Sequence, residues 1–213
     1  MAKNSKLAAS ILRDILPQKL SKSDLRRLDI LNGAIKTYSR IDIKYVSYED
    51  IGREAKASSA LIQHYFPDKK DLLLIAMKLV RGQFQQLVID SMVNEQKPLA
   101  IMEKYVRGTF RWLEVSPQHV QAWFFFLYLC GMDEGLRKTH LELTEMGQVR
   151  ITEILRIGVE TKVFHPKLPL PVLAKQIQKV ITGGLIEVKT EAGSSALKRI
   201  EDETWELCLS LLT

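Results

Sequence analysis

Hydrophobic positions recur every three or four residues over nearly the whole chain, which is the period of an amphipathic helix. Leu28, Leu31, Ile35 and Tyr38, for example, form one apolar stripe on a helix expected at about residues 23–40. Alternating β-branched runs joined by Asn-Gly or Asp-Gly turns, which would indicate strands, are absent from the sequence. The pattern therefore predicts an all-α protein.

Prolines and capping residues divide this pattern into separate helices. Ser47 with Asp50 three residues later resembles a capping box, and Ser58 precedes a short apolar pattern that ends at Phe66, just before Pro67. Two short helices are therefore predicted at about 48–55 and 58–66. Longer helices are predicted at about 68–93, 98–114, 117–130, 134–162, 171–191 and 195–211.

Three segments follow from this order of elements. Residues 1–22 are an N-terminal extension, in which 3–16 form either a short amphipathic helix or a poorly ordered tail. Residues 23–70 contain the short helices, and residues 71–213 form a larger helical domain. The boundary near 70–90 falls inside a predicted helix, so we expect a mechanical connection between the two domains.

Composition agrees with a soluble globular protein, since 46% of residues are hydrophobic and 26% are charged. The most apolar run, residues 122–132, is shorter than the ~20 residues of a membrane span and is better explained as a buried helix. Cys130 and Cys208 lack metal or redox spacing, so we expect buried, inert thiols in a reducing cytoplasm. No membrane association is expected.

The positive charge is concentrated in the first part of the chain. Residues 1–81 contain 16 Lys and Arg against 9 Asp and Glu, whereas residues 82–213 contain 15 against 16. An excess of this kind favours a polyanionic partner for the N-terminal part.

Three short helices with a tight turn, in a basic segment, are typical of a helix-turn-helix that binds double-stranded DNA. In the third helix, Ile62 and Phe66 are predicted to face the core, while Ser59 and Gln63 lie on another face beside Ala60 and His64. Short helices with polar outer faces also occur in many helical proteins that bind no DNA. The pattern alone leaves both interpretations open.

If the helix enters a major groove, its side chains suggest specific contacts. The amide of Gln63 suits adenine, and Leu61 suits a thymine methyl group. Ser58 at the helix start, Lys69 beyond its end, and Arg26 or Arg27 in the helix predicted at about 23–40 are candidate phosphate contacts.

The stretches 47–52 (SYEDIG) and 57–73 (ASSALIQHYFPDKKDLL) resemble the DNA-binding domain of the TetR family of bacterial repressors, over about residues 25–80. The most specific part is HYFPDK followed by the Leu pair. The resemblance implies a homodimer that reads a palindromic operator and a C-terminal domain that binds a small-molecule inducer. The DNA-binding positions expected from the pattern and the resemblance together are Ser47, Tyr48, Ser58, Ser59, Ala60, Leu61, Gln63, His64, Lys69, Arg26 and Arg27.

Two features depart from the family pattern. Lys56 stands where the family usually has the turn glycine, and a left-handed conformation costs a non-glycine residue ~1 kcal/mol. Leu61 and Gln63 differ from the common choices in the recognition helix. The operator sequence therefore does not follow from relatives.

Aromatic residues gather on two successive helices of the C-terminal part. Core packing explains many of them, but the run 123–126 points in all directions around a helix, so a ligand cavity or a subunit interface is a further explanation. The stretch 122–126 is loosely similar to the choline-responsive branch of the family, and an aromatic cage with Glu114 as counter-charge would suit a quaternary ammonium. The candidate ligand-binding residues are Phe110, Trp112, Trp123, Phe126 and Tyr128.

The final two helices are the expected dimer interface, because in the family this pair usually forms a four-helix bundle with its counterpart. Gly183 and Gly184 in the middle of a helix indicate close helix approach. Packing within the chain alone is the alternative.

An enzyme is not expected. The four histidines, at 64, 119, 140 and 165, are scattered without metal-ligand spacing, and the sequence contains no nucleophile elbow, phosphate loop or HExxH pattern. No catalytic residue, metal or cofactor is therefore assigned. A DNA-binding regulator or activator without a ligand remains the alternative to a ligand-responsive repressor.

Overall fold

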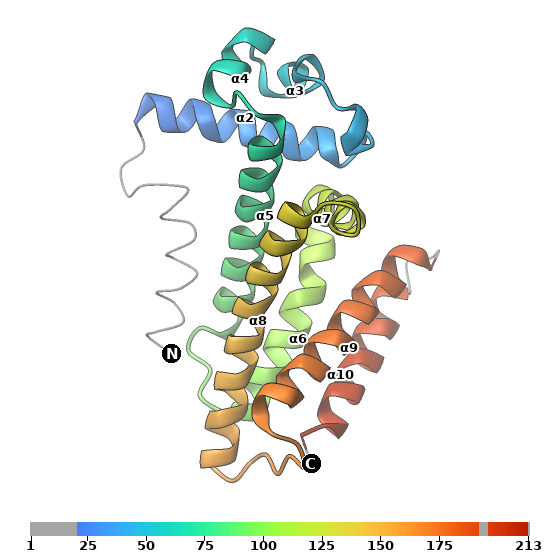
Figure 1. Cartoon of the computed structure of the whole chain (residues 1–213). Helices are drawn as coiled ribbons and strands as arrows, with labels where there is room; N and C mark the ends of the chain where they lie inside the picture. Colours follow the sequence, from blue (N-terminus) through green and yellow to red (C-terminus); the bar gives the residue numbers. More distant parts are fainter. Residues whose placement is uncertain (1–20, 192–195, 213) are drawn as a thin grey trace. The chain divides into compact units, whose positions relative to one another are not determined.

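The computed structural model describes residues 21–191 and 196–212, and over these ranges every regular element is helical. The predicted all-α fold is confirmed, whereas the pattern at residues 3–16 lies outside the described part of the chain. The α-helices, drawn in Figure 1, are α2 (Lys22–Tyr38), α3 (Tyr48–Ala55), α4 (Ser59–Tyr65), α5 (Lys69–Met92), α6 (Pro98–Val115), α7 (Pro117–Cys130), α8 (Glu134–Glu160), α9 (Leu170–Thr190) and α10 (Ala196–Ser210), and a short 3-10 helix η1 (Ile43–Tyr45) precedes α3.

Local capping signals explain where several helices begin. Ser21 caps α2 and Ser47 caps α3, each in a reciprocal capping box with the aspartate three residues later. Helices α6 and α7 each begin at a proline, where the missing N–H costs no intrahelical hydrogen bond. These helices therefore begin close to the positions that the sequence predicts.

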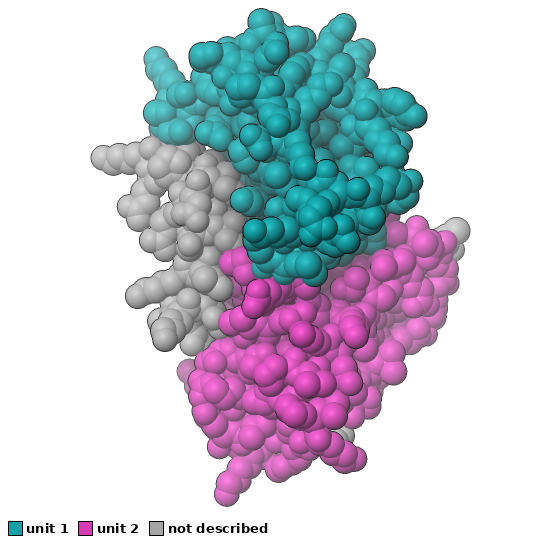
Figure 2. Space-filling view, viewed as in Figure 1, with its two compact units in different colours: residues 1–86, 115–143 teal, residues 87–114, 144–213 magenta. Residues whose placement is uncertain are grey.

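The chain forms two compact units, coloured separately in Figure 2. One comprises residues 1–86 and 115–143, and the other comprises residues 87–114 and 144–213. The chain passes from one unit to the other within α5, at the end of α6 and within α8. The first unit thus holds the predicted DNA-binding segment together with most of α5, all of α7 and the start of α8.

Helix α2 packs against the other helices of the predicted DNA-binding segment in the first unit. It packs against α3 and α7, and α3 packs in turn against α4. Ile30, Ile35 and Ile51 have at most 1% of their surface exposed and form the centre of this core. At Gly33 the helices approach so closely that an added Cβ would lie 2.7 Å from the Cβ of Ala55, so any larger residue would push α3 away.

In the second unit, α9 packs against α10 through buried apolar faces. Gly184 allows this approach, because an added Cβ would lie 2.4 Å from the Thr204 hydroxyl oxygen and 2.8 Å from the Phe110 ring. The expected close approach is therefore confirmed at Gly184. Gly183 differs, since its side-chain position faces open space with no atom within 4 Å.

The turn between α3 and α4 has a left-handed residue at its centre. Lys56 has φ 48° and ψ 51°, and its N–H donates to the carbonyl of Gly52. This is the position at which the sequence departs from the expected glycine, and the structure confirms that a lysine adopts the left-handed conformation there.

Replacing this residue by glycine tests the strain directly. We expect Lys56→Gly to raise the free energy of unfolding by about 0.5–1 kcal/mol, because the left-handed penalty of a Cβ exceeds the extra chain entropy of glycine. Chemical denaturation measures the change. Lys78→Gly, at an exposed position inside α5, is the matched control and should lose about 1 kcal/mol. A loss of stability in Lys56→Gly would instead mean that the lysine side chain supports the turn.

Candidate nucleic-acid interface

Helices α3 and α4 with their turn have the geometry of a helix-turn-helix. The side-chain oxygen of Ser47 accepts from the N–H of Asp50 at the start of α3, and that of Ser58 accepts from the N–H of Leu61 at 3.2 Å at the start of α4. These caps fix where each helix begins, and the left-handed Lys56 sets the change of direction between them.

Helix α4 has two distinct faces. Ile62 is fully buried and Phe66, which follows the helix, is 2% exposed, so both pack into the core as the sequence predicts. The opposite face consists of exposed residues with short or polar side chains, and no described hydrogen bond engages the amide of Gln63 within the protein. The exposed residues on and next to α4 are Ser58, Ser59, Ala60, Gln63 and His64, with Leu61 half-buried.

Two predicted DNA contacts, Tyr48 and Lys69, also hold the end of α4 against the start of α3. The Tyr48 hydroxyl donates to the carbonyl of Phe66 at 2.7 Å, and partial burial raises its pKa, with a smaller effect from the charge of Asp68. The Lys69 ammonium donates to the carbonyl of Val46 at 3.2 Å and lies 5.5 Å from the Tyr48 ring. Lys69 remains exposed, which leaves its outer side open to solvent.

The two predicted arginine contacts of α2 also have partners within the first unit. Arg26 donates to the carbonyl of Lys56 at 2.7 Å and, more weakly, to that of Ala55 at 3.4 Å. Arg27 is exposed, and its guanidinium lies 5.0 Å from the centre of the Phe66 ring. The sequence did not predict these partners, and no local signal identifies them, because they lie about 30 to 40 residues away along the chain.

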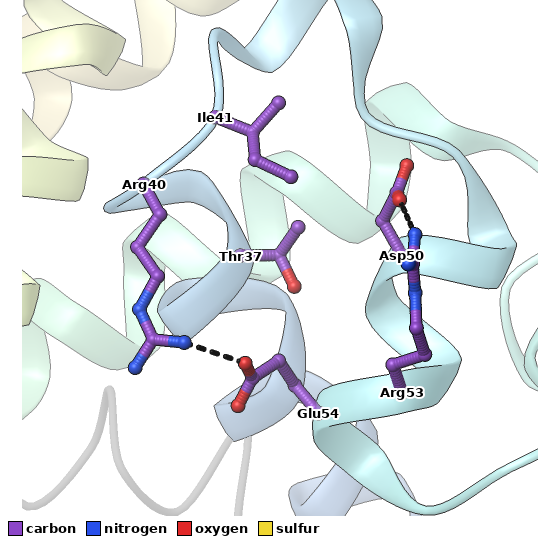
Figure 3. Close-up of a pocket in the computed structure, with 6 residues that line it drawn as sticks. All are labelled: Thr37, Arg40, Ile41, Asp50, Arg53 and Glu54. Carbon is purple, nitrogen blue, oxygen red and sulfur yellow. Dashed lines mark hydrogen bonds and ion pairs between the residues drawn. The ribbon is translucent and has the colours of Figure 1, made fainter.

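One ion pair links the segment just after α2 to α3, and a second lies within α3, as Figure 3 shows. Arg40 pairs with Glu54 at 2.7 Å, and Arg53 pairs with Asp50 within α3. Hydrogen bonds from Ser47, together with the charge of Arg53, keep the pKa of Asp50 below its ordinary value. These residues line a small open pocket with Thr37 and Ile41, and its charged groups are already paired with one another.

The candidate ligand-binding residues are divided between the two units. Phe110 and Trp112 are 1% exposed and belong to the second unit. Trp123 and Phe126 are buried in the first unit, whereas Tyr128 on the same helix is 59% exposed with the Lys44 ammonium 5.7 Å from its ring. Of the five candidate residues, Tyr128 is therefore the one whose side chain is exposed, whereas the other four are buried.

An arginine and a histidine accompany the buried aromatic residues of the first unit. The Arg81 guanidinium lies 4.8 Å from the Phe84 ring centre and 5.9 Å from that of Trp123. The ring centre of His140 lies 6.4 Å from that of Phe126, and burial, reinforced by the positive charge of Arg81, lowers its pKa. The sequence pattern does not single out Arg81, and it draws attention to His140 only as a possible metal ligand.

The second unit contains its own buried polar group. Arg150 is 4% exposed, and burial lowers its pKa, partly opposed by Tyr105. Gln178 donates to the carbonyl of Thr144 at 3.3 Å and lies beside Gly147, where an added Cβ would be 3.1 Å from the Gln178 amide nitrogen. Glu114, the predicted counter-charge for a cationic ligand, is exposed on α6.

Within the described residues, no group of three or more His, Cys, Asp or Glu side chains is arranged to hold a metal ion. Cys130 and Cys208 are both buried and unpaired, and burial raises their pKa values to about 11 and about 12, which keeps both as thiols. Helix α5 is long and apolar enough for a membrane span, but 61% of its apolar window is buried inside the protein, as expected for a core helix.

Comparison with known proteins identifies the N-terminal segment. The family described as "Bacterial regulatory proteins, tetR family" matches residues 30–76, which include the second half of α2, all of α3 and α4, and the start of α5. The "HTH-type transcriptional regulator BetI" of Agrobacterium fabrum is 27% identical over 120 residues, covering 56% of this chain and 58% of that protein. Its counterpart from Rhizobium meliloti is 25% identical over the same length. The match therefore spans a little over half of these relatives.

Solved structures share the fold over most of the chain. A TetR-family regulator from Rhodococcus sp. has a TM-score of 0.77 at 14% identity, covering 88% of this chain and 99% of that one. A transcriptional regulator from Saccharomonospora viridis in complex with choline also has a TM-score of 0.77, at 20% identity, covering 87% and 96%. The helix-turn-helix geometry and the family match agree: residues 30–76 match the tetR family of bacterial regulatory proteins, and the chain shares the fold of these solved structures.

Proposed function

We propose that this protein is a transcriptional repressor that binds a palindromic DNA operator as a homodimer and is released by a small-molecule effector. The observation that carries the proposal is the two-faced helix α4, whose apolar side is anchored by Ile62 and Phe66 while its short polar side chains face solvent. A bacterial regulator of this kind acts in the cytoplasm, where its DNA is.

The exposed face of α4 suits the edges of base pairs in a major groove about 12 Å wide. Gln63 carries both a donor and an acceptor on one amide, which matches the pair that adenine presents. Ser59 and Ala60 are short enough to let the helix backbone approach the bases, and His64 lies next to Gln63 at the edge of this face.

Phosphate contacts are assigned to groups around the helix-turn-helix. Ser47 and Ser58 lie at the helix starts, and the exposed cations Arg27 and Lys69 both lie near the end of α4, Arg27 over the Phe66 ring and Lys69 beside Tyr48. The excess of 16 basic over 9 acidic residues in positions 1–81 supports salt-dependent attraction to DNA.

Base reading by Gln63 is tested with a duplex selected by the wild-type protein from a random DNA pool, which we expect to contain a palindrome. Gln63→Ala should weaken binding to this duplex by about 1–3 kcal/mol while leaving binding to random duplex and its salt dependence nearly unchanged. Fluorescence anisotropy titrations on both duplexes measure the difference.

Gln96→Ala, at an exposed glutamine outside α4, is the control and should bind both duplexes as the wild type does. An equal loss on both duplexes would show that Gln63 does not read bases. Failure of the wild type to select any palindrome would refute operator binding itself.

Dimerisation is assigned to the outer faces of α9 and α10. The α9 side chains Val172 and Ile186 are each 44% exposed, and Leu207 on α10 is 59% exposed. Gly183 lies on the same side of α9 as Ile186, one turn earlier, and its open space permits close approach by another helix. A second copy of the same helix pair would cover these apolar groups in a four-helix bundle.

A charge in this face should separate the subunits. We expect Ile186→Arg to give monomers at micromolar concentration, because two copies would place buried like charges near one another across a twofold axis. Sedimentation equilibrium measures the association state. Val163→Arg is the control: it places the same charge at an exposed apolar residue of the second unit that lies outside α9 and α10, and it should leave the dimer intact. A dimeric Ile186→Arg protein would contradict the assigned interface.

The effector is assigned to the helical part that follows α4, without a commitment to choline. One structural relative was solved with choline, and the curated relatives above carry the name BetI. In this chain, however, the Arg81 guanidinium already lies over the Trp123 ring. A quaternary ammonium at that face would meet a like charge. The family resemblance therefore supports a small-molecule effector, but it does not support a cationic one.

A further inference from the structure

The first turns of α2 contact the helix-turn-helix at three points. Ser23 donates to the Tyr65 hydroxyl at 3.3 Å, and Arg27 lies over the Phe66 ring, both at the end of α4. Arg26 is different, because its guanidinium reaches the turn between α3 and α4 and donates to the carbonyls of Ala55 and Lys56. A residue of another helix, Arg26 of α2, thus hydrogen-bonds the backbone of the turn.

The end of α3 needs such a partner. The last carbonyls of any helix lack intrahelical donors. Here the Gly52 carbonyl accepts from the N–H groups of both Lys56 and Ala57, which closes the left-handed turn. The carbonyls of Ala55 and Lys56 lie just beyond that closure. A cationic donor suits them, since the helix C-terminus carries partial negative charge and charge-assisted hydrogen bonds are the stronger kind.

A carboxylate also lies near the guanidinium. Asp29, one turn along α2, lies 3.8 Å from the same nitrogen that donates to Ala55, and the Arg26 side chain is only 29% exposed. The close approach of Gly33 to Ala55 fixes the distance between α2 and α3. Arg26 therefore projects from a helix that packs closely against α3, within reach of the turn.

We propose that Arg26 is a positioning residue: it caps the end of α3, stabilises the left-handed turn at Lys56 and thereby sets the direction of α4 toward DNA. This assignment replaces the phosphate contact that the sequence suggests for Arg26. Its consequence for operator binding rests on the proposed function, whereas its effect on the turn does not.

Three variants separate positioning from phosphate contact. Arg26→Ala removes both the charge and the donors, and Arg26→Lys keeps the charge but loses the planar pair of donors that spans two carbonyls. Arg40→Ala is the matched control, because Arg40 also links the α2 region to α3, through Glu54, without touching the turn (Figure 3).

The first readout needs no DNA. Amide hydrogen exchange at Lys56 and Ala57 should accelerate about tenfold in Arg26→Ala and nearly as much in Arg26→Lys, as expected for removal of a charge-assisted hydrogen bond. Arg40→Ala should leave these two amides unchanged. Exchange that is unaltered in Arg26→Ala, or altered equally in Arg40→Ala, would overturn the proposal.

The second readout is binding to the duplex selected by the wild type and to a random duplex, over a range of salt concentrations. Arg26→Ala and Arg26→Lys should both bind the selected duplex about tenfold more weakly, with the salt slope and the random-duplex affinity unchanged. A phosphate-binding role for Arg26 predicts the contrary: the salt slope of Arg26→Ala would fall by about one, and Arg26→Lys would bind nearly as the wild type does.

The two proposals fail in different ways. If the wild type selects no palindrome, operator binding is refuted, and the exchange measurement still decides whether Arg26 holds the turn. If a palindrome is selected but the Arg26 variants show the phosphate pattern, operator binding stands and the positioning role is refuted.

Discussion

The direction of α4 depends on a single reversal of the backbone, the left-handed turn at Lys56, and on the groups that hold this turn in place. Within the turn, the Gly52 carbonyl accepts two N–H groups and brings the chain round sharply after α3. Outside it, Arg26 satisfies the carbonyls that the reversal leaves at the helix end. A lysine is thereby accommodated where glycine would carry less strain.

Side chains also hold the backbone at the far end of α4. Tyr48 donates to the carbonyl of Phe66, and Lys69 donates to the carbonyl of Val46. Each of these side chains joins the start of α3 to the segment that follows α4, so the two helices are connected at both ends. Tyr48 and Lys69, which the sequence analysis predicts as DNA contacts, thus have structural partners within the protein too.

Signals that act over a few residues were sufficient to locate the helices and the exposed face of α4. The capping box of Ser47 and Asp50, the cap at Ser58 and the prolines at 98 and 117 are local, and so is the three-to-four-residue period that buries Ile62 and Phe66. The charge asymmetry and the family resemblance then made DNA the expected partner. The short helix η1 was missed, because three residues carry no period.

Tertiary structure alone decided what the long side chains do. Arg26 and Arg27 meet the turn and Phe66 across about 30 to 40 residues of sequence, and Arg81 meets Trp123 from another helix. It also divided the predicted aromatic site between two units and exposed Tyr128. Sequence period fixes which face of a helix is buried, but the partner of a side chain depends on how separate helices pack, and that is a property of the folded chain.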